Sequence, residues 1–427
     1  MQRPTCFTLK FRLNRLDSPM AREIANLTGD QQRHTFDSDI VFPLALDLFV
    51  DGPNDVSSME KLTYAIFPFL VGSKLKIKVF DDGNSNQLLL VSCAQQDENI
   101  FRFLIRINGV VTDSMVNRDL ELSCLLALFK LRGTPEVYCT FNNGICYSFV
   151  NGISMVTSDL FHAEYKWLIC DELAHFHSLP MYDVLSRSVT IRAHSKGSRM
   201  NDNPVAFQRL RDWVGNLPDH MADAQRNDEY HSIFPTAEYL LREANFLEDA
   251  LSDATSPVVF CHNDILASNI ILSEDKDKVT FIDYEFCGFN HAAFEIGNHF
   301  CEYAGIEPVD YTNYPSLTFQ REWIAYYLKR IRYYRKQSRN SSHSPNWEIS
   351  GNHHSVNGDC AYPKSEEVER WLKEVNYFAL VAHLTWGVWA AIRASNGPQD
   401  FDFLALAFAR IQEYERIKPL IVSQFSG

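Results

Sequence analysis

One stretch of the chain, from Phe260 to Phe286, constrains the fold more than any other. It reads FCHNDILASNIILSEDKDKVTFIDYEF, in which short apolar, β-rich runs alternate with polar turns. His262 and Asp264 follow the run VVF, Asn269 opens the run NIIL, and Asp283 closes the run VTFI. Runs of this kind, bounded by turn residues, predict short strands joined as hairpins. We therefore expect the three oxygen-bearing side chains at strand ends, close to one another.

The order H-x-D-x-x-x-x-N, followed by a strand that ends in aspartate, suits phosphoryl transfer. Asp264 would accept the proton of an attacking hydroxyl group. Asn269 and Asp283 would each give an oxygen atom to Mg²⁺, a hard cation that prefers such ligands. The alternative is that these polar side chains only cap a hairpin. The β-rich runs on both sides, and the second aspartate at the end of VTFI, favour phosphoryl transfer.

The overall charge narrows the class of partner. The 427 residues include 54 acidic and 40 basic side chains, a formal net charge of -14. A nucleic acid or an anionic membrane surface needs a basic face, so neither partner is expected, whereas a small cationic substrate is compatible. Ten cysteines without a CxxC pair predict a reducing compartment, and we expect the protein to be cytoplasmic.

The chain is expected to contain two folded parts. Residues 1–40 read as a disordered tail, 41–146 as an N-terminal lobe of strands with one helix, 147–152 as a hinge, and 153–427 as a helical C-terminal lobe. An insertion near 339–363 is poor in apolar periodicity and is predicted to be disordered. The basic, acid-free first sixteen residues leave a mitochondrial presequence as an alternative to a plain tail.

An apolar run near the C-terminus raises the question of a membrane span. The run FALVAHLTWGVWAAI, residues 378–392, is shorter than the ~20 apolar residues that a span requires. We therefore predict a core helix there and no stable membrane insertion.

The motifs of the chain occur in the order of a known enzyme family. LIRING and NRDLEL come first, then SPVVFCHNDILASNIIL, VTFIDYEF and FEIGNHFCEYAG, and finally FALVAHLTWGVWAAI and FDFLALAFARIQEY. In these motifs the chain resembles the choline/ethanolamine kinase family, and its ethanolamine kinase branch more closely. The resemblance implies an α+β, bilobal protein-kinase-like fold with a small β-rich N-lobe and a larger helical C-lobe.

The same resemblance implies the reaction. ATP, with Mg²⁺, would give its γ-phosphate to the hydroxyl of ethanolamine, which yields phosphoethanolamine in the first step of the CDP-ethanolamine route to phosphatidylethanolamine. The implied catalytic residues are Asp264, Arg106 and Glu121, with Arg106 neutralising phosphate charge and Glu121 holding Arg106. The implied nucleotide-binding residues are Ser85, Asn86, Arg106, Ser148 and Val150. The implied metal-binding residues are Asn269, Asp283 and Glu285.

The substrate pocket is expected to recognise a cation. Aromatic rings attract any ammonium group, and a carboxylate also accepts hydrogen bonds from a primary ammonium, which choline lacks. The resemblance assigns this pocket to Asp264, Glu302, Phe286, Trp386 and Trp389. Without the resemblance, core packing would be the simpler explanation for the two tryptophans. His262 and His299 are expected to be structural.

Three positions depart from the family pattern. Gln87 stands where the family often has lysine, Leu406 where it usually has tyrosine, and Glu295 where it has an aspartate thought to brace the catalytic loop. None of these removes a catalytic group. The alternatives left open are a choline kinase, a dual choline/ethanolamine kinase, and an inactive ATP-binding scaffold. The oligomeric state is also open, with a homodimer as one alternative.

Overall fold

The computed structural model describes residues 43–80, 86–94, 100–109, 115–187, 203–340, 362–395 and 401–425. The described chain divides into two compact units. Unit 1 comprises residues 43–109 and 136–149, and unit 2 comprises residues 115–135 and 150–425. The predicted tail, and most of the predicted insertion near 339–363, lie outside the described residues.

Unit 1 is built on one six-stranded sheet with the strand order β1-β5-β6-β4-β3-β2. The strands are β1 (Leu44–Leu46), β2 (Leu75–Phe80), β3 (Asn86–Ala94), β4 (Ile100–Asn108), β5 (Val137–Phe141) and β6 (Gly144–Ser148). β1 runs parallel to β5, and all the other neighbours are antiparallel. The prediction that this part of the chain consists mainly of strands is confirmed.

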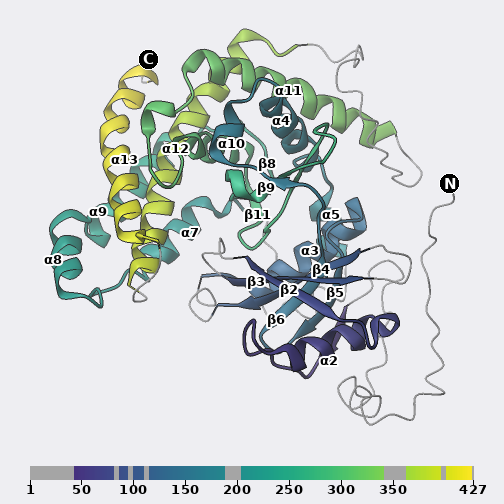
Figure 1. Cartoon of the computed structure of the whole chain (residues 1–427). Helices are drawn as coiled ribbons and strands as arrows, with labels where there is room; N and C mark the ends of the chain where they lie inside the picture. The colour runs from purple at the N-terminus through teal and green to yellow at the C-terminus, as the bar shows by residue number, and fades with distance from the viewer. Residues whose placement is uncertain are drawn as a thin grey trace. The chain divides into compact units, whose positions relative to one another are not determined.

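One helix supplies the apolar partner of this sheet (Figure 1). Helix α2 (Val56–Ile66) begins at Asp55, whose carboxylate accepts a hydrogen bond from the Ser58 amide at 3.1 Å, and the short η1 (Pro68–Leu70) follows it. Its buried Leu62 belongs to one apolar cluster with Val91 and Phe103 of the sheet. Burying an apolar side chain of this size stabilises the fold by roughly 1.5–3 kcal/mol, so this cluster holds the unit together.

Helix α3 (Arg118–Arg132) is capped at both ends. The Asn117 side chain accepts a hydrogen bond from the Leu120 amide at 3.0 Å, and Gly133 closes the helix with a φ of 73°, a conformation that glycine adopts at least cost. The sequence places this helix in the N-terminal lobe, whereas in the structure it groups with unit 2. Arg132 forms an ion pair with Glu172 of helix α4 (Tyr165–Phe176), which is one contact between α3 and the rest of unit 2.

Unit 2 is mostly helical. Its other helices are α4 (Tyr165–Phe176), α5 (Met181–Arg187), α7 (Val205–Val214), α8 (Ala224–Ile233), α9 (Ala237–Ala250), α10 (Ala292–Cys301), α11 (Leu317–Asn340), α12 (Ser365–Ala394) and α13 (Phe403–Phe425). Short 3-10 turns occur at η3 (Thr157–Phe161), η4 (Ala267–Asn269), η5 (Glu302–Ala304) and η6 (Tyr311–Asn313).

Helix α12 forms the centre of this unit, with α10 and α13 packed along it (Figure 1). Among the described helices, it is the one long and apolar enough to span a membrane, yet its apolar window is entirely buried inside the unit. The prediction of a core helix is therefore confirmed. Gly297 of α10 permits the close approach, because a Cβ atom there would lie 2.4 Å from the Val375 carbonyl oxygen.

Two small antiparallel sheets interrupt the helices and carry the HxDxxxxN motif. One has the order β10-β9-β7, and the other pairs β11 with β8. The strands are β7 (Ile153–Ser154), β8 (Val258–Cys261), β9 (Ile270–Leu272), β10 (Val279–Phe281) and β11 (Gly288–His291). The predicted hairpin pairs Phe281 with Ile270. The Ile282 amide also donates to the Asn269 carbonyl at 3.0 Å, which brings the segments around Asp264 and Asp283 together.

Candidate active site

The loop between β8 and β9 begins with a buried histidine. His262 Nε2 lies 2.8 Å from the carbonyl oxygen of Ile282, which ties the loop to the end of β10. Burial lowers the pKa of His262 and so keeps the ring neutral. The structural role predicted for His262 is confirmed. His299 is held similarly, with Nδ1 2.9 Å from the Ile265 carbonyl oxygen.

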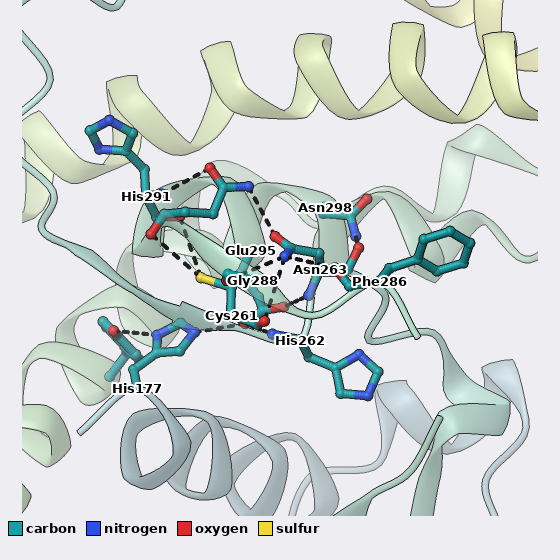
Figure 2. A network of polar contacts seen from close by, with 11 residues as sticks. His177, Cys261, His262, Asn263, Phe286, Gly288, His291, Glu295 and Asn298 are labelled. Atoms are coloured by element: carbon teal, nitrogen blue, oxygen red, sulfur yellow. Dashed lines mark hydrogen bonds and ion pairs between the residues drawn. The ribbon is translucent and has the colours of Figure 1, made fainter. Parts of the chain in front are cut away.

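Asn263, the residue before Asp264, fixes the shape of the loop, and sequence reasoning missed it. Its φ is 67°, in the left-handed region that asparagine tolerates better than most residues. Its side-chain Nδ2 donates to the Phe286 carbonyl at 3.0 Å, and its Oδ1 accepts from Asn290 at 2.9 Å (Figure 2). Its own carbonyl accepts from Asn298 at 3.1 Å. The signal was present in the sequence as a polar residue between His262 and Asp264.

Glu295 braces the same loop from helix α10. Its carboxylate accepts hydrogen bonds from the amides of His262, at 3.0 Å, and Asn263 (Figure 2). His177 Nε2 lies 2.7 Å from the same carboxylate, and His177 Nδ1 lies 2.7 Å from the Tyr327 hydroxyl. Burial alone would raise the pKa of Glu295, but the His177 contact and the Asn263 amide lower it. Glu295 is one methylene longer than aspartate, yet it still holds the loop backbone in the way expected of an aspartate at this position.

The same place contains a group that could be mistaken for a metal centre. Ligand atoms of His177, Cys261 and Glu295 lie within 4.8 Å of one another. Burial raises the pKa of the Cys261 thiol well above its usual value, and its Sγ contacts the Asn290 carbonyl at 3.6 Å. Because a neutral thiol is a poor metal ligand and the Glu295 oxygens already bind the loop, this group is a hydrogen-bond network.

Asp264 lies in a concentration of negative charge. Its pKa is raised well above the ordinary value, first by removal of the carboxyl from water and then by the nearby carboxylates of Glu302, Asp283 and Glu285. Arg209 opposes this shift. Four carboxylates in one place create a potential that attracts cations, both a metal ion and an ammonium group.

The metal-binding prediction can be compared with the donor atoms at this place. The Asn269 side-chain nitrogen donates to the backbone carbonyl of Asp264 at 2.9 Å and to its carboxylate at 3.2 Å. The oxygen of the same amide is therefore the atom that could bind a cation. Asp283 follows β10 with a φ of 65° and an exposed side chain. Two hard oxygen donors beside a carboxylate cluster fit Mg²⁺.

Glu285 has a partner that the sequence did not reveal. Arg118 Nη1 lies 3.1 Å from the Glu285 carboxylate and 3.1 Å from the Glu121 carboxylate. One guanidinium thus holds two of the predicted site residues, which are 164 positions apart in the sequence. Arg106, the predicted partner of Glu121, belongs to unit 1, so that pair stays a prediction.

The structure brings the three predicted aromatic residues into one cluster. The rings of Phe286 and Trp386 meet at 5.4 Å between centroids, and those of Trp386 and Trp389 at 5.5 Å, both edge to face. Trp213 of helix α7 adds a fourth ring, 5.8 Å from Phe286 and 6.0 Å from Trp386. Sequence reasoning missed Trp213, because nothing in the pattern of α7 distinguishes it from a core residue.

Two arginines reach this aromatic and acidic region. Arg209 of α7 donates from Nη2 to the Phe286 carbonyl at 2.7 Å. Arg410 of α13 donates from Nη2 to Glu302 Oε1 at 2.7 Å, and both of these side chains are buried. Glu302, the predicted acidic partner of the substrate, is therefore already anchored through one oxygen. Leu406, at the position where tyrosine was expected, is buried on α13.

The nucleotide-binding residues predicted in unit 1 share one sheet. Arg106 is buried on β4, in register with Leu88 and Ile145. Asn86 opens β3, and its side-chain oxygen accepts from the Gly109 amide at 3.4 Å. The Ser148 hydroxyl accepts from the Glu136 amide at 2.9 Å. Val150 belongs to unit 2, and Ser85 lies outside the described residues. Their contacts with a nucleotide stay predictions.

Comparison with known proteins decides the family. A family model described as choline/ethanolamine kinase matches residues 77–415. The chain belongs to the choline/ethanolamine kinase family. Relatives in this family include ethanolamine kinase 2 of Mus musculus, 32% identical over 361 residues that cover 84% of this chain and 81% of the relative. A probable ethanolamine kinase of Nematostella vectensis is 33% identical over 367 residues, which cover 85% of this chain and 93% of the relative.

A solved structure from the family confirms the predicted fold class. An ethanolamine kinase of Plasmodium vivax superimposes with a TM-score of 0.66 at 21% identity, over 85% of this chain and 89% of the other. At that identity the likeness concerns the fold alone. The chain has the family's protein-kinase-like α+β fold, with a small β-rich unit and a larger helical one, and it is a phosphotransferase of the kinase class.

Proposed function

We propose that the protein is an ethanolamine kinase, which transfers the γ-phosphate of ATP to the hydroxyl of ethanolamine and releases phosphoethanolamine and ADP. The observation that carries this proposal is the carboxylate cluster around Asp264, which includes Glu302 and Asp283. One cluster offers a base for the hydroxyl, an acceptor for the ammonium and a ligand for a metal ion. The relatives named ethanolamine kinase support the choice of alcohol.

In the proposed mechanism, Asp264 orients the hydroxyl and accepts its proton as the new O–P bond forms and the bond to ADP breaks. Asn269 and Asp283 would hold Mg²⁺, with Glu285 close by and paired with Arg118. Bound Mg²⁺ supplies positive charge for the phosphate oxygens. The chain's own part is alignment, because phosphoryl transfer makes little covalent demand on the protein. The network of Asn263 and Glu295 supports that alignment.

The nucleotide is assigned to Arg106, Asn86 and Ser148 of the N-terminal sheet, together with Ser85 and Val150. Arg106 would neutralise phosphate charge, Asn86 and Ser85 would cover the phosphates, and backbone groups at Ser148 and Val150 would bind adenine. Arg106 is buried on β4 of that sheet. Glu121 would hold Arg106 in place.

The preference for ethanolamine over choline is assigned to Glu302 and the four-ring cluster. Arg410 anchors one carboxylate oxygen of Glu302, and the other could accept hydrogen bonds from a primary ammonium. Choline has no N–H donor, so it would gain only the cation–π attraction of the rings. A site that combines a carboxylate acceptor with aromatic rings thus favours the primary amine.

The proposed cellular setting is based on the product of the reaction and on the state of the cysteines. The product would enter the CDP-ethanolamine route to phosphatidylethanolamine. The eight cysteines in the described part of the chain are all free and buried, which supports a reducing, cytoplasmic location. The proposed small-molecule partners are ethanolamine and ATP. A homodimer is an alternative that size measurements in solution can test.

The test is direct product formation. Purified protein is incubated with ATP, Mg²⁺ and ethanolamine, and phosphoethanolamine is measured by mass spectrometry beside an established ethanolamine kinase. Parallel reactions with choline and with the N-methylated ethanolamines rank the substrates. We expect phosphoethanolamine as the main product. Absence of product from any of these alcohols, while the established enzyme is active, would contradict the proposal.

A further inference from the structure

Arg209 lies against two rings of the aromatic cluster, although no motif points to it. Its guanidinium carbon is 5.7 Å from the ring centroid of Phe286 and 5.8 Å from that of Trp213. Both distances are within the ~6 Å at which a cation is attracted to an aromatic ring. Burial lowers the pKa of Arg209 to about 10, so the side chain remains a cation at neutral pH. The chain itself thus already places positive charge against the rings of this cluster.

This position divides the four rings into two pairs. Arg209 covers Phe286 and Trp213, and a planar guanidinium stacks on rings more broadly than a lysine ammonium does. Trp386 and Trp389 meet at 5.5 Å, and the Arg393 guanidinium carbon lies 6.0 Å from the ring centroid of Trp389. Both rings lie on α12, one helical turn apart, and Arg209 and Arg393 together limit the ring surface that the cation of a substrate can contact.

The two candidate alcohols differ in how many rings they need. A trimethylammonium group has no N–H, so its binding depends on surrounding ring faces, whereas a primary ammonium combines one ring with a carboxylate acceptor such as Glu302. Repulsion by the Arg209 charge acts on both cations alike and does not distinguish them. Coverage of ring faces does distinguish them.

We propose that Arg209 is a specificity-determining residue, which selects primary over quaternary ammonium alcohols by covering the faces of Phe286 and Trp213. This inference rests on the proposed function. The same guanidinium donates to the Phe286 carbonyl at 2.7 Å, and Asn263 donates to that carbonyl at 3.0 Å. Arg209 therefore also contributes to loop position, and the test must separate this contribution from specificity.

The test compares three variants with the wild type. Arg209→Met removes the charge and the planar group, and Arg209→Lys keeps the charge but covers less ring surface. Arg211→Met is the matched control on the same helix, since Arg211 pairs with Glu248 and Asn245 of α9. The quantity measured is kcat/KM for choline divided by kcat/KM for ethanolamine. A merely structural role would lower both values and leave their ratio unchanged.

We expect Arg209→Met to raise this ratio by about tenfold or more. A change of this size corresponds to the free energy of one desolvated cation–π contact. Arg209→Lys should raise the ratio by less, and Arg211→Met should leave it unchanged. If Arg209→Met does not fold, as judged by thermal unfolding, Arg209→Lys carries the test. A wild-type ratio in the Arg209 variants, or an equal rise in Arg211→Met, would overturn the inference.

A second measurement separates this inference from the proposed function. Titration calorimetry gives the Kd of ethanolamine and of choline for each variant without requiring turnover. If the wild type makes no phosphoethanolamine but the ratio of the two Kd values still shifts in Arg209→Met, the proposed function fails and the specificity role stands. If turnover is normal and neither ratio shifts, the specificity role fails and the function stands.

Discussion

The indole N–H of Trp386 donates a hydrogen bond to Asn298 Oδ1 at 2.8 Å, and Asn298 donates in turn to the Asn263 carbonyl at 3.1 Å. Trp386 belongs to the aromatic cluster, and Asn263 precedes the predicted catalytic base. The asparagine thus connects the part of the site assigned to the ammonium group with the part assigned to the hydroxyl. This connection gives the first prediction.

Asn298→Ala should weaken both stability and substrate binding. The variant leaves the Trp386 N–H and the Asn263 carbonyl unpaired in the interior, and each buried unpaired group costs about 1–3 kcal/mol. We expect the free energy of unfolding to fall by about 2 kcal/mol or more, and the KM for ethanolamine to rise. Urea unfolding and steady-state kinetics measure the two effects. Asn313→Ala, at an exposed asparagine, is the control and should change neither.

Glu295→Gln should impair catalysis although it changes no group that contacts substrate. The amide keeps the length of the side chain but loses the negative charge of the carboxylate, whose oxygens accept hydrogen bonds from His262, Asn263 and His177. Since hydrogen bonds to a charged acceptor contribute about 1.5–3 kcal/mol, we expect lower stability and a lower kcat. Glu238→Gln removes an exposed acid that pairs with Arg242 and should change little. Wild-type kcat in Glu295→Gln would show that the brace is not needed.

His383 should make the fold sensitive to mild acid. Burial first, and then the charges of Arg410 and Arg416, lower the pKa of His383 well below its ordinary value of 6.5. The unfolded chain therefore binds a proton that the folded chain does not. Stability from this group is fully present above about pH 6.5 and is lost as the pH falls below it, by at most about 1.4 kcal/mol per pH unit.

The comparison of His383→Phe with the wild type isolates this effect. Free energies of unfolding are measured in urea between pH 7.5 and pH 5.5. Other buried histidines, His262 and His299, also have lowered pKa values and act in the same direction in both proteins. We expect the variant to lose less stability than the wild type on acidification. If both proteins lose the same free energy of unfolding on acidification, the pKa of His383 does not differ between the folded and the unfolded chain.

Removal of the metal should stop turnover, and Asp283 should set how much metal is needed. We expect a chelator to abolish phosphoethanolamine formation and excess Mg²⁺ to restore it. Asp283→Asn should raise the Mg²⁺ concentration at half-maximal rate by about tenfold or more, since loss of one charged ligand weakens a Mg²⁺ site. Asp275→Asn, at an exposed acid between β9 and β10, is the matched control. Equal Mg²⁺ requirements in the two variants would exclude Asp283 as a ligand.

The sequence predicted the local elements of this site well because their signals are local. The apolar runs beside Asp264 and Asp283 specify the strands, and turn residues specify the hairpin register. Asn117 and Gly133 specify the ends of α3 through caps that involve only nearby residues. These features depend on spacing along the chain, which the sequence records directly.

The residues that complete the site could not be predicted, because tertiary packing brings them in. Arg209 contacts Phe286 from 77 positions away, and Arg410 reaches Glu302 from 108 positions away. On their own helices each reads as an ordinary polar side chain of an amphipathic pattern. Only the packing of α7 and α13 in unit 2 shows that their guanidinium groups point inward.

The most direct test of the central claim is the kcat of Asp264→Asn, measured with ethanolamine and saturating Mg²⁺ and ATP. Loss of a base that accepts the hydroxyl proton should lower kcat by about 10²- to 10⁴-fold, while the Kd of the Mg²⁺–ATP complex stays within about twofold of the wild type. A kcat within tenfold of the wild-type value, in a folded variant that still binds nucleotide, would contradict the assignment of Asp264 as the base.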